Sequence, residues 1–278
     1  MAVSFAESPE FQRLVAGNSQ VNLARIALEI GRDVYPDVDI DAYLEKIKDF
    51  AERARSRFRE GATLREVVGQ INWVLFVEEK FRGNHDDYYD PRNSYLNEVL
   101  DRGLGIPITL SVVYRAMAER LGLAMAGVDL PLHFMLRVDD RGEPWFVDPF
   151  RGGVLYDRKG CEQRLSEIAN REVTLVDAAI EPCSSGVLIS RMLRNLKVIY
   201  GRTGEIGSLL PIQRRLTALN RGQPGELRDL GVLCVQADRL GEAIEPLQAY
   251  LEISPGADDA AEIGDLLGAV RREVSRWN

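Results

Sequence analysis

The stretch DLPLHFMLRVDDRGEPWFVDPFRGG, residues 129–153, holds one of the two histidines of the chain. Apolar and polar side chains alternate on both sides of a polar DDRG segment at 139–142. Alternation with a period of two is typical of β-strands, and a short polar segment with glycine between two such runs is typical of a hairpin turn. The stretch therefore predicts a β-hairpin with His133 in its first strand and Asp148 at the end of its second.

The register of this hairpin decides whether His133 and Asp148 meet. If DDRG forms a four-residue loop, Leu136 lies opposite Trp145 and His133 lies opposite Asp148. Directly opposed residues share one face of a sheet, with Cβ atoms about 5 Å apart. We therefore expect a hydrogen bond of about 2.6 to 3.2 Å between the two side chains. The spacing leaves two interpretations open: half of a catalytic site, or a buried histidine satisfied by a neighbouring acid.

A buried helix is predicted just before this hairpin. In DRGLGIPITLSVVYRAMAERLGL, Pro107 suits the first turn of a helix that runs to about Leu121, and Gly122 ends it. The segment is apolar on most sides, which predicts burial between two layers of structure. A short strand at about 124–129 should connect the helix to the hairpin.

The first eighty residues predict helices. Apolar side chains recur at helical spacing within 23–34, 43–58 and 64–75. The polar segment GNHDDYYDPRNS, residues 83–94, follows as a loop. Its His85, Asp86 and Asp87 resemble metal ligands in type, but adjacent side chains rarely converge on one ion, so a solvated or hydrogen-bonded loop is the expectation. No metal and no cofactor are predicted.

A family resemblance rests on three motifs: YYDPRNSYLNEVLDRGLGIPITLS at 88–111, GVDLPLHF at 127–134 and VDPFRGG at 147–153. The order of a buried helix, a strand with His and a strand ending in Asp-Pro resembles the transglutaminase-like, papain-related fold. More narrowly, the motifs resemble the transglutaminase-like proteins known as SirB regulators, which carry C-terminal tetratricopeptide repeats. The resemblance spans nearly the whole chain. It implies an α+β fold, with a helical N-terminal region and an antiparallel sheet beside a central helix, followed by a short all-α repeat domain.

The resemblance carries over two catalytic positions but not the third. His133 matches the family histidine and Asp148 the family aspartate. A Cys starts the helix in that family, whereas Pro107 stands at this position here. The nearest hydroxyls belong to Thr109, about 200° around the helix from Pro107, and Ser111, about 40° away but one turn deeper. The expected site is therefore degenerate.

The three cysteines do not replace the missing nucleophile. Cys161 lies in a polar segment after the sheet, Cys183 in a linker and Cys234 in a later helix. None is predicted at a helix N-terminus that would lower the pKa of its thiol. Their odd number and wide spacing indicate neither a disulfide framework nor a zinc site, which favours a reducing cytoplasm.

The C-terminal part predicts helical repeats. RDLGVLCVQADRLGEAIEPLQAYLEISP, residues 228–255, fits the tetratricopeptide pattern, and 191–224 fits it more weakly. A last helix at about 257–277 would cap the array. The predicted domains are 1–180, transglutaminase-like, and 187–278, repeats with a capping helix. Two interpretations of the repeats are open: they bind a protein partner, or they only brace the first domain.

Composition narrows the function classes further. A formal net charge of −8 argues against nonspecific nucleic-acid binding and against docking on an anionic membrane. The first residues lack the features of a signal peptide, and no apolar run approaches the roughly 18 residues of a membrane span. We expect a cytoplasmic, noncatalytic regulatory module, a pseudoenzyme that binds a protein through its repeats or its cleft. The alternative is an amidase, peptidase or acyl-transferase that uses His133 and Asp148 with an unorthodox nucleophile. The oligomeric state is not indicated.

Overall fold

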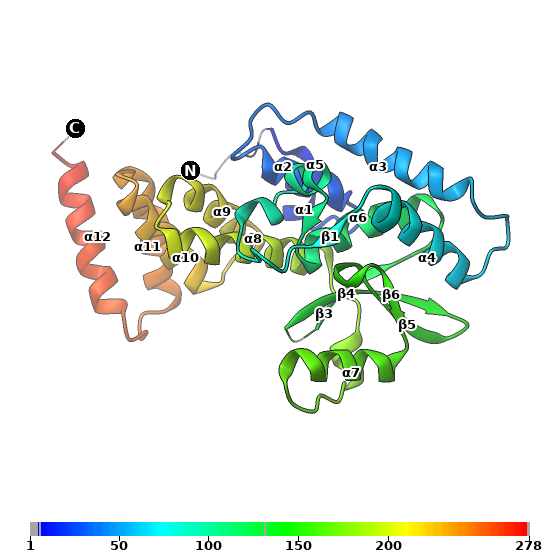
Figure 1. The fold of residues 1–278 in the computed structure, drawn as a ribbon. Helices are drawn as coiled ribbons and strands as arrows, with labels where there is room; N and C mark the ends of the chain where they lie inside the picture. The colour runs from blue at the N-terminus through cyan, green and yellow to red at the C-terminus, as the bar shows by residue number, and fades with distance from the viewer. Residues whose placement is uncertain (1–4, 6, 131, 277–278) are drawn as a thin grey trace. The chain divides into compact units, whose positions relative to one another are not determined.

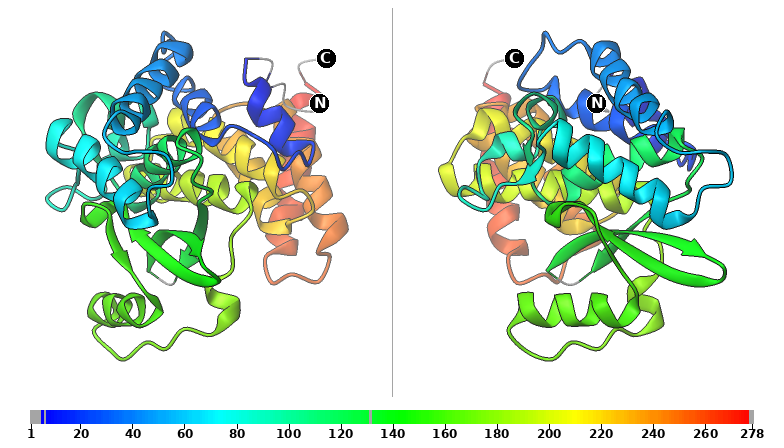
Figure 2. Two further views of the ribbon diagram at one scale, coloured as in Figure 1. Left: turned by 90° about the vertical axis from the view of Figure 1, so that its right-hand side faces the viewer. Right: turned by 45° about the vertical axis from the view of Figure 1, so that its right-hand side comes forward.

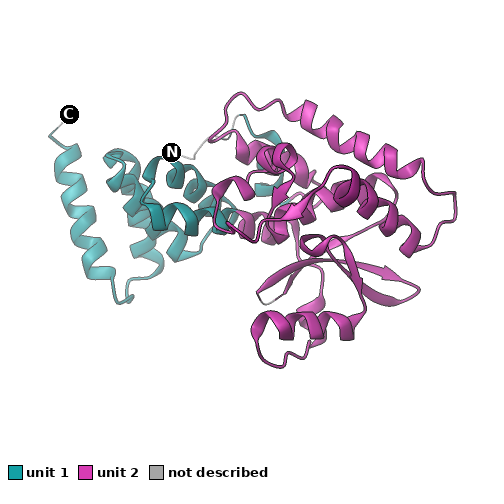
Figure 3. Ribbon diagram, viewed as in Figure 1, with its two compact units in different colours: residues 1–17, 193–278 teal, residues 18–192 magenta. Residues whose placement is uncertain are grey.

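The structure is a computed structural model that describes residues 5, 7–130 and 132–276. The described residues form two compact units (Figure 3). One comprises residues 18–192, and the other comprises the chain up to residue 17 together with the chain from 193 onward. The domain boundary expected between 180 and 187 stays a prediction.

Helices dominate the first part of the 18–192 unit, as predicted. They are α2 (Leu23–Gly31), α3 (Ile40–Arg55) and α4 (Leu64–Asn72), which continues as the π-helix η1 (Trp73–Glu78). Each α-helix begins after a residue whose side chain accepts a backbone N–H: Asn22, Asp39 and Thr63 respectively. Such caps satisfy donors that the first helical turn leaves free. The apolar stripes of these helices are largely buried.

The sheet that carries His133 has four antiparallel strands in the order β3-β4-β5-β6 (Figure 1). The α+β class predicted from the sequence is confirmed. A separate parallel pair joins β1 and β2. The strands are β1 (Arg82–Gly83), β2 (Leu104–Gly105), β3 (Ala126–Leu130), β4 (His133–Asp140), β5 (Glu143–Asp148) and β6 (Val154–Tyr156). The connecting elements in this unit are η2 (Pro91–Asn93), α5 (Leu96–Arg102), α6 (Pro107–Arg120), η3 (Pro149–Arg151), α7 (Arg158–Ala169) and η4 (Asp177–Ile180).

The hairpin is present, but the predicted loop is wrong. Asp140 pairs with Glu143, so the loop between β4 and β5 has two residues rather than four. Arg141 and Gly142 both have positive φ, 53° and 87°, as a two-residue turn that matches strand twist requires. The register therefore shifts by two residues: Leu136 pairs with Val147, not Trp145. A shift of two leaves every side chain on its expected face.

The sheet lies between two helical layers. Helix α6 packs against β4, and most of its residues are buried, as predicted for a helix between layers. On the other face, Val128, Met135 and Phe146 form a core with Cys161 and Leu165 of α7. Both views in Figure 2 show α7 separated from the N-terminal helices by the strands. This layering fixes which residues of the hairpin face α7.

The second unit contains helical repeats. Its elements are α1 (Pro9–Val15), the later part of α8 (Ser185–Thr203), α9 (Ile206–Leu219), α10 (Pro224–Gln236), α11 (Leu240–Ile253) and α12 (Ala260–Val274). Gly231 of α10 lies so close to α11 that an added Cβ would be 2.4 Å from Leu247 Cδ2. This close approach is the packing that the sequence pattern predicted. The expected capping helix at 257–277 is α12, and position 277 lies outside the described residues. None of the helices in the described ranges combines the length and hydrophobicity needed to cross a membrane.

Candidate functional site

His133 and Asp148 form a buried pair at one end of the sheet. His133 is the first residue of β4 and Asp148 the last of β5. Their Nε2 and Oδ2 atoms lie 2.9 Å apart, within the expected range. The side chains are only 4% and 0% exposed. The pair is therefore covered by protein rather than lining an open cleft, and its catalytic role stays a prediction.

Neighbouring groups fix the carboxylate of Asp148. Its Oδ1 atom accepts a hydrogen bond from the backbone N–H of Phe150 at 3.1 Å, which caps the 3-10 helix η3. The Nε atom of Arg164, in α7, lies 3.8 Å from Asp148 Oδ2. The backbone N–H of Phe150 and the guanidinium of Arg164 thus hold the carboxylate from two sides. A histidine held by a carboxylate in this way suits a general base, and equally a structural hydrogen bond.

An aromatic cluster adjoins the pair. The ring centroid of Phe150 lies 6.2 Å from that of His133 and 4.4 Å from that of His85. Tyr88 packs edge-on against Phe150, with 6.2 Å between centroids. Gly83 makes room for this arrangement, because a Cβ there would lie 2.5 Å from the Phe150 ring. Both histidines of the chain thus contact one phenylalanine.

The position of the family nucleophile holds no reactive group. Pro107 is buried at the first position of α6. The Thr109 hydroxyl donates to the Asn93 carbonyl oxygen at 2.7 Å and accepts from the Ile106 N–H at 3.1 Å. Ser111 donates to the Pro107 carbonyl oxygen at 2.7 Å. Each hydroxyl proton is therefore used within the fold, which argues against either oxygen as a nucleophile.

Cys161 is the fourth residue of α7, so the expectation that no cysteine lies near a helix N-terminus is wrong, but its surroundings disfavour the thiolate. Burial, together with the nearby Asp148 and Glu162 carboxylates, raises the pKa of the Cys161 thiol to about 12. Its Sγ atom lies 3.8 Å from Met135 Sδ, within the core under α7. Burial also raises the pKa values of Cys183 and Cys234. The thiolate is the nucleophilic form, so these shifts suppress reactivity at neutral pH.

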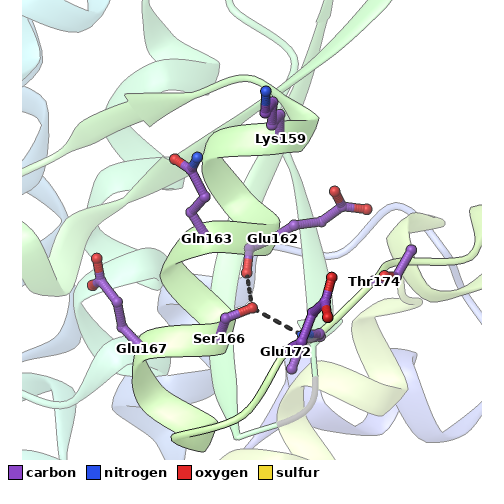
Figure 4. Close-up of a pocket in the computed structure, with 8 residues that line it drawn as sticks. Lys159, Glu162, Gln163, Ser166, Glu167, Glu172 and Thr174 are labelled. Atoms are coloured by element: carbon purple, nitrogen blue, oxygen red, sulfur yellow. Dashed lines mark hydrogen bonds between the residues drawn. The ribbon is translucent and has the colours of Figure 1, made fainter.

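Two pockets lie away from the pair. One, of about 470 Å³, is lined by the outward side of α7 and the following segment, including Glu162, Ser166 and Glu172 (Figure 4). There Ser166 donates to the Glu162 carbonyl oxygen at 2.7 Å and accepts from the Val173 N–H at 2.9 Å. The other lies between Lys197 and α10 in the repeat unit. Neither is lined by His133 or Asp148.

The sequence predicts the pair but not the residues that surround it. Among His85, Asp86 and Asp87, which were considered as metal ligands, His85 packs on Phe150 and the Asp87 N–H donates to Asn84 Oδ1 at 3.1 Å. No group of three or more metal-ligating side chains converges within the described residues. The glycine just before Asn84, at Gly83, was the one available signal that an aromatic ring would approach this loop.

Comparison with known proteins agrees with this architecture. Residues 41–194 match the transglutaminase-like superfamily, and residues 196–268 match the tetratricopeptide repeat. A UPF0162 protein of Xylella fastidiosa is 34% identical over 236 residues, 84% of each chain. A UPF0162 protein of Vibrio cholerae is 25% identical over 87% of this chain and 90% of its own.

More distant similarities are partial. The F-box only protein 21 of Mus musculus is 36% identical over 110 residues, which are 37% of this chain and 18% of that protein. The crystal structure of menin aligns with 91% of this chain and 61% of its own at a TM-score of 0.47 and 14% identity. The superfamily match and the Xylella relative are decisive: the chain belongs to the transglutaminase-like superfamily and, with the UPF0162 proteins, to one family.

Proposed function

We propose that this chain is a noncatalytic, regulatory protein-interaction module built on a degenerate transglutaminase-like domain. The observation that carries the proposal is the state of the nucleophile position. Pro107 has no nucleophilic atom, and the hydroxyls of Thr109 and Ser111 are bound to backbone carbonyl oxygens. An acyl-transfer reaction with a covalent intermediate needs an activated nucleophile next to its base.

The burial of His133 and Asp148 supports the same conclusion. A general base must reach the proton that it removes, directly or through one water molecule. With His133 4% exposed and Asp148 fully buried, the pair has little access to a substrate. Its hydrogen bond connects the ends of β4 and β5, which is a structural role.

The repeats supply the second half of the proposal. Tetratricopeptide repeats stack helix pairs into a surface that suits protein binding. Binding of a protein partner by residues 187–278 or by the first domain, residues 1–180, is the proposed activity. The narrower identity as a SirB-type regulator that acts in the cytoplasm belongs to this proposal and rests on the motifs at 88–111, 127–134 and 147–153.

The competing function is an amidase, peptidase or acyl-transferase. It draws support from one observation, the His133–Asp148 hydrogen bond of 2.9 Å. A panel of chromogenic amide and ester substrates tests it, with His133→Ala measured beside the wild type. We expect no turnover that depends on His133. Turnover that disappears in His133→Ala, with the variant still folded, would overturn the noncatalytic proposal.

A further inference from the structure

The N-terminal segment of the chain packs on the helical repeats. The chain up to Gly17 belongs to the same compact unit as residues 193–278, although residues 18–192 separate the two stretches in the sequence (Figure 3). The contact is between α1 and α9, and Phe11 and Leu14 of α1 are buried. A surface of the repeat unit is thus covered by a segment from the far end of the chain.

Arg215 of α9 is the centre of this contact. The Cζ atom of its guanidinium lies 4.7 Å from the ring centroid of Phe11 and 5.1 Å from that of Phe5. Its Nη2 atom donates to the Ser8 hydroxyl oxygen at 3.1 Å. The two rings meet edge to face, with 4.9 Å between their centroids. Arginine and aromatic side chains in desolvated contacts supply much of the binding energy of protein interfaces.

The segment that makes this contact is short and follows an exposed path into the rest of the chain. Helix α1 spans only seven residues, Pro9–Val15. Helices shorter than about 12 residues are marginal in water by themselves, so packing on α9 stabilises α1. The following residues, 16–20, are exposed. An exposed link of this kind can change its backbone angles when the segment moves.

The residue beneath the segment is charged, which distinguishes this contact from a permanent apolar core. Arg215 is only 3% exposed, and arginine is seldom buried to this extent in a folded chain. Uncovering an apolar side chain costs free energy, whereas an uncovered guanidinium is hydrated favourably. Hydration of Arg215 therefore offsets part of the loss of contact with Phe5 and Phe11. The surface of α9 is compatible with both a covered and an uncovered state.

We propose that the N-terminal strap, defined by Phe5 and residues 7–17, occupies a docking surface of the repeat unit around Arg215, and that a protein partner binds there when the strap leaves. The partner segment that fits is a short helix with two aromatic side chains beside a hydrogen-bond acceptor, which is the arrangement of the strap itself. A segment tethered in the same chain competes at a high effective concentration, so the strap lowers the affinity for such a partner. The inference rests on the proposed protein-interaction function and names its surface and its control.

Fluorescence anisotropy with a labelled peptide, FAESPEFQRLVAG from residues 5–17, tests this surface on the full chain. The double substitution Phe5→Ala/Phe11→Ala in the chain weakens the strap and leaves Arg215 in place. We expect this variant to bind the peptide at least about tenfold more tightly than the wild-type chain, in which the intact strap competes. The control Glu7→Gln, at an exposed position of the strap, should bind as weakly as the wild type. A folded double variant without this gain of binding would refute the proposal.

Substitutions in the repeat unit locate the peptide on the chain. Arg215→Ala, added to the double variant, should weaken peptide binding by about tenfold or more, because it removes the group that both rings contact. Arg221→Ala, at an exposed arginine of the same unit, is the matched control and should change binding by less than about twofold. Equal binding by the Arg215→Ala and Arg221→Ala chains would overturn the proposal.

Cleavage of the wild-type chain decides the question if the double variant does not fold. A specific protease site inserted between Gly17 and Asn18, in the exposed link, cuts the tether and leaves the sequence of the strap unchanged. The labelled peptide should then exchange with the cleaved strap, with the circular dichroism spectrum unchanged. A cleaved strap that does not exchange, or a chain that unfolds on cleavage, would show that the strap is part of the core. Turnover that depends on His133 would instead remove the noncatalytic function and leave this surface standing.

Discussion

His133 Nε2 and Asp148 Oδ2 lie 2.9 Å apart, although the two residues are not paired in the β4–β5 ladder. The backbone pairing of these strands runs from Asp140 and Glu143 to Leu136 and Val147. The side-chain hydrogen bond lies beyond its last pair. It therefore joins the ends of β4 and β5 where backbone pairing has stopped, and it positions Asp148 to cap η3.

Replacing His133 by alanine should lower the free energy of unfolding by about 1 to 3 kcal/mol, because a fully buried Asp148 oxygen loses its partner. Equilibrium urea unfolding of the wild type and the variant measures this loss. Gln163→Ala, at an exposed position of α7, is the control and should change stability by no more than about 0.5 kcal/mol. In His133→Ala/Asp148→Ala the combined loss should be smaller than the sum of the two single losses. Additive losses would show that the pair is not coupled.

The face of His133 and Asp148 could be predicted from the sequence because side-chain direction alternates strictly along a strand. The register of the β4–β5 pairing could not be predicted from the sequence. The sequence predicts Asp139 and Asp140 in the loop, but both residues belong to β4. Polar side chains at the tip of a hairpin are compatible with either a loop or a strand. The positive φ of Arg141, 53°, sets the two-residue loop, and an arginine in the sequence does not predict a positive φ.

The surroundings of the pair depend on contacts between segments distant in sequence. Arg164 reaches Asp148 from α7, and Phe150 meets His85 across the fold. Periodicity indicates that a segment is helical, but it does not determine which neighbouring element a polar side chain contacts. Pro107, by contrast, could be interpreted from the sequence alone, because no tertiary structure is needed to see that a proline lacks a thiol.

The three native thiols should react slowly with iodoacetamide at neutral pH. Burial raises the pKa of each one, that of Cys161 to about 12, so little thiolate is present. Mass spectrometry of timed samples would locate the modified residue. In concentrated guanidinium chloride all three should react readily. Fast modification of Cys161 in the folded protein would contradict its assigned burial and reopen an enzymatic role.

The close packing of α10 on α11 predicts opposite effects for two glycine substitutions. Gly231→Ala should destabilise the repeat unit by about 1 to 3 kcal/mol, because the added Cβ would lie 2.4 Å from Leu247 Cδ2. Gly241→Ala in α11 meets no heavy atom within 4 Å and should stabilise by about 0.4 to 1 kcal/mol. Thermal unfolding followed by circular dichroism compares the two. A neutral Gly231→Ala would mean that the helices are not packed closely here.

The repeat unit should lose stability in acid through Asp229. Burial alone would raise the pKa of Asp229, but hydrogen bonds from Lys197, at 2.7 Å, and from Arg228 outweigh it and hold the pKa below its usual value. The folded state then binds a proton less readily than the unfolded state. The stabilisation is therefore complete above about pH 4 and is lost as pH falls through the lowered pKa.

Asp229→Asn tests this dependence. The variant should be less stable than the wild type at pH 7, and the difference should shrink as the pH falls below about 4. Urea unfolding at a series of pH values measures it. Asp238→Asn, at an exposed carboxylate of the same unit, should leave the loss of stability at low pH unchanged. A difference between Asp229→Asn and the wild type that does not vary with pH would refute the assignment.

Pro107→Cys tests whether the first position of α6, which the family resemblance assigns to the nucleophile, supports a reactive thiol. The variant should fold, because proline at the first helical position is favourable but not required. A thiol at the start of α6 meets the positive end of the helix dipole, which favours the thiolate. Position 107 is buried, which opposes this shift. We expect the effect of the dipole to be the larger one, so that the introduced thiol reacts with iodoacetamide faster at neutral pH than Cys183, the native thiol that is not fully buried. Combining Pro107→Cys with His133→Ala then separates two causes: reactivity that survives comes from the helix alone, whereas reactivity that falls to the level of Cys183 shows that His133 still acts on this position.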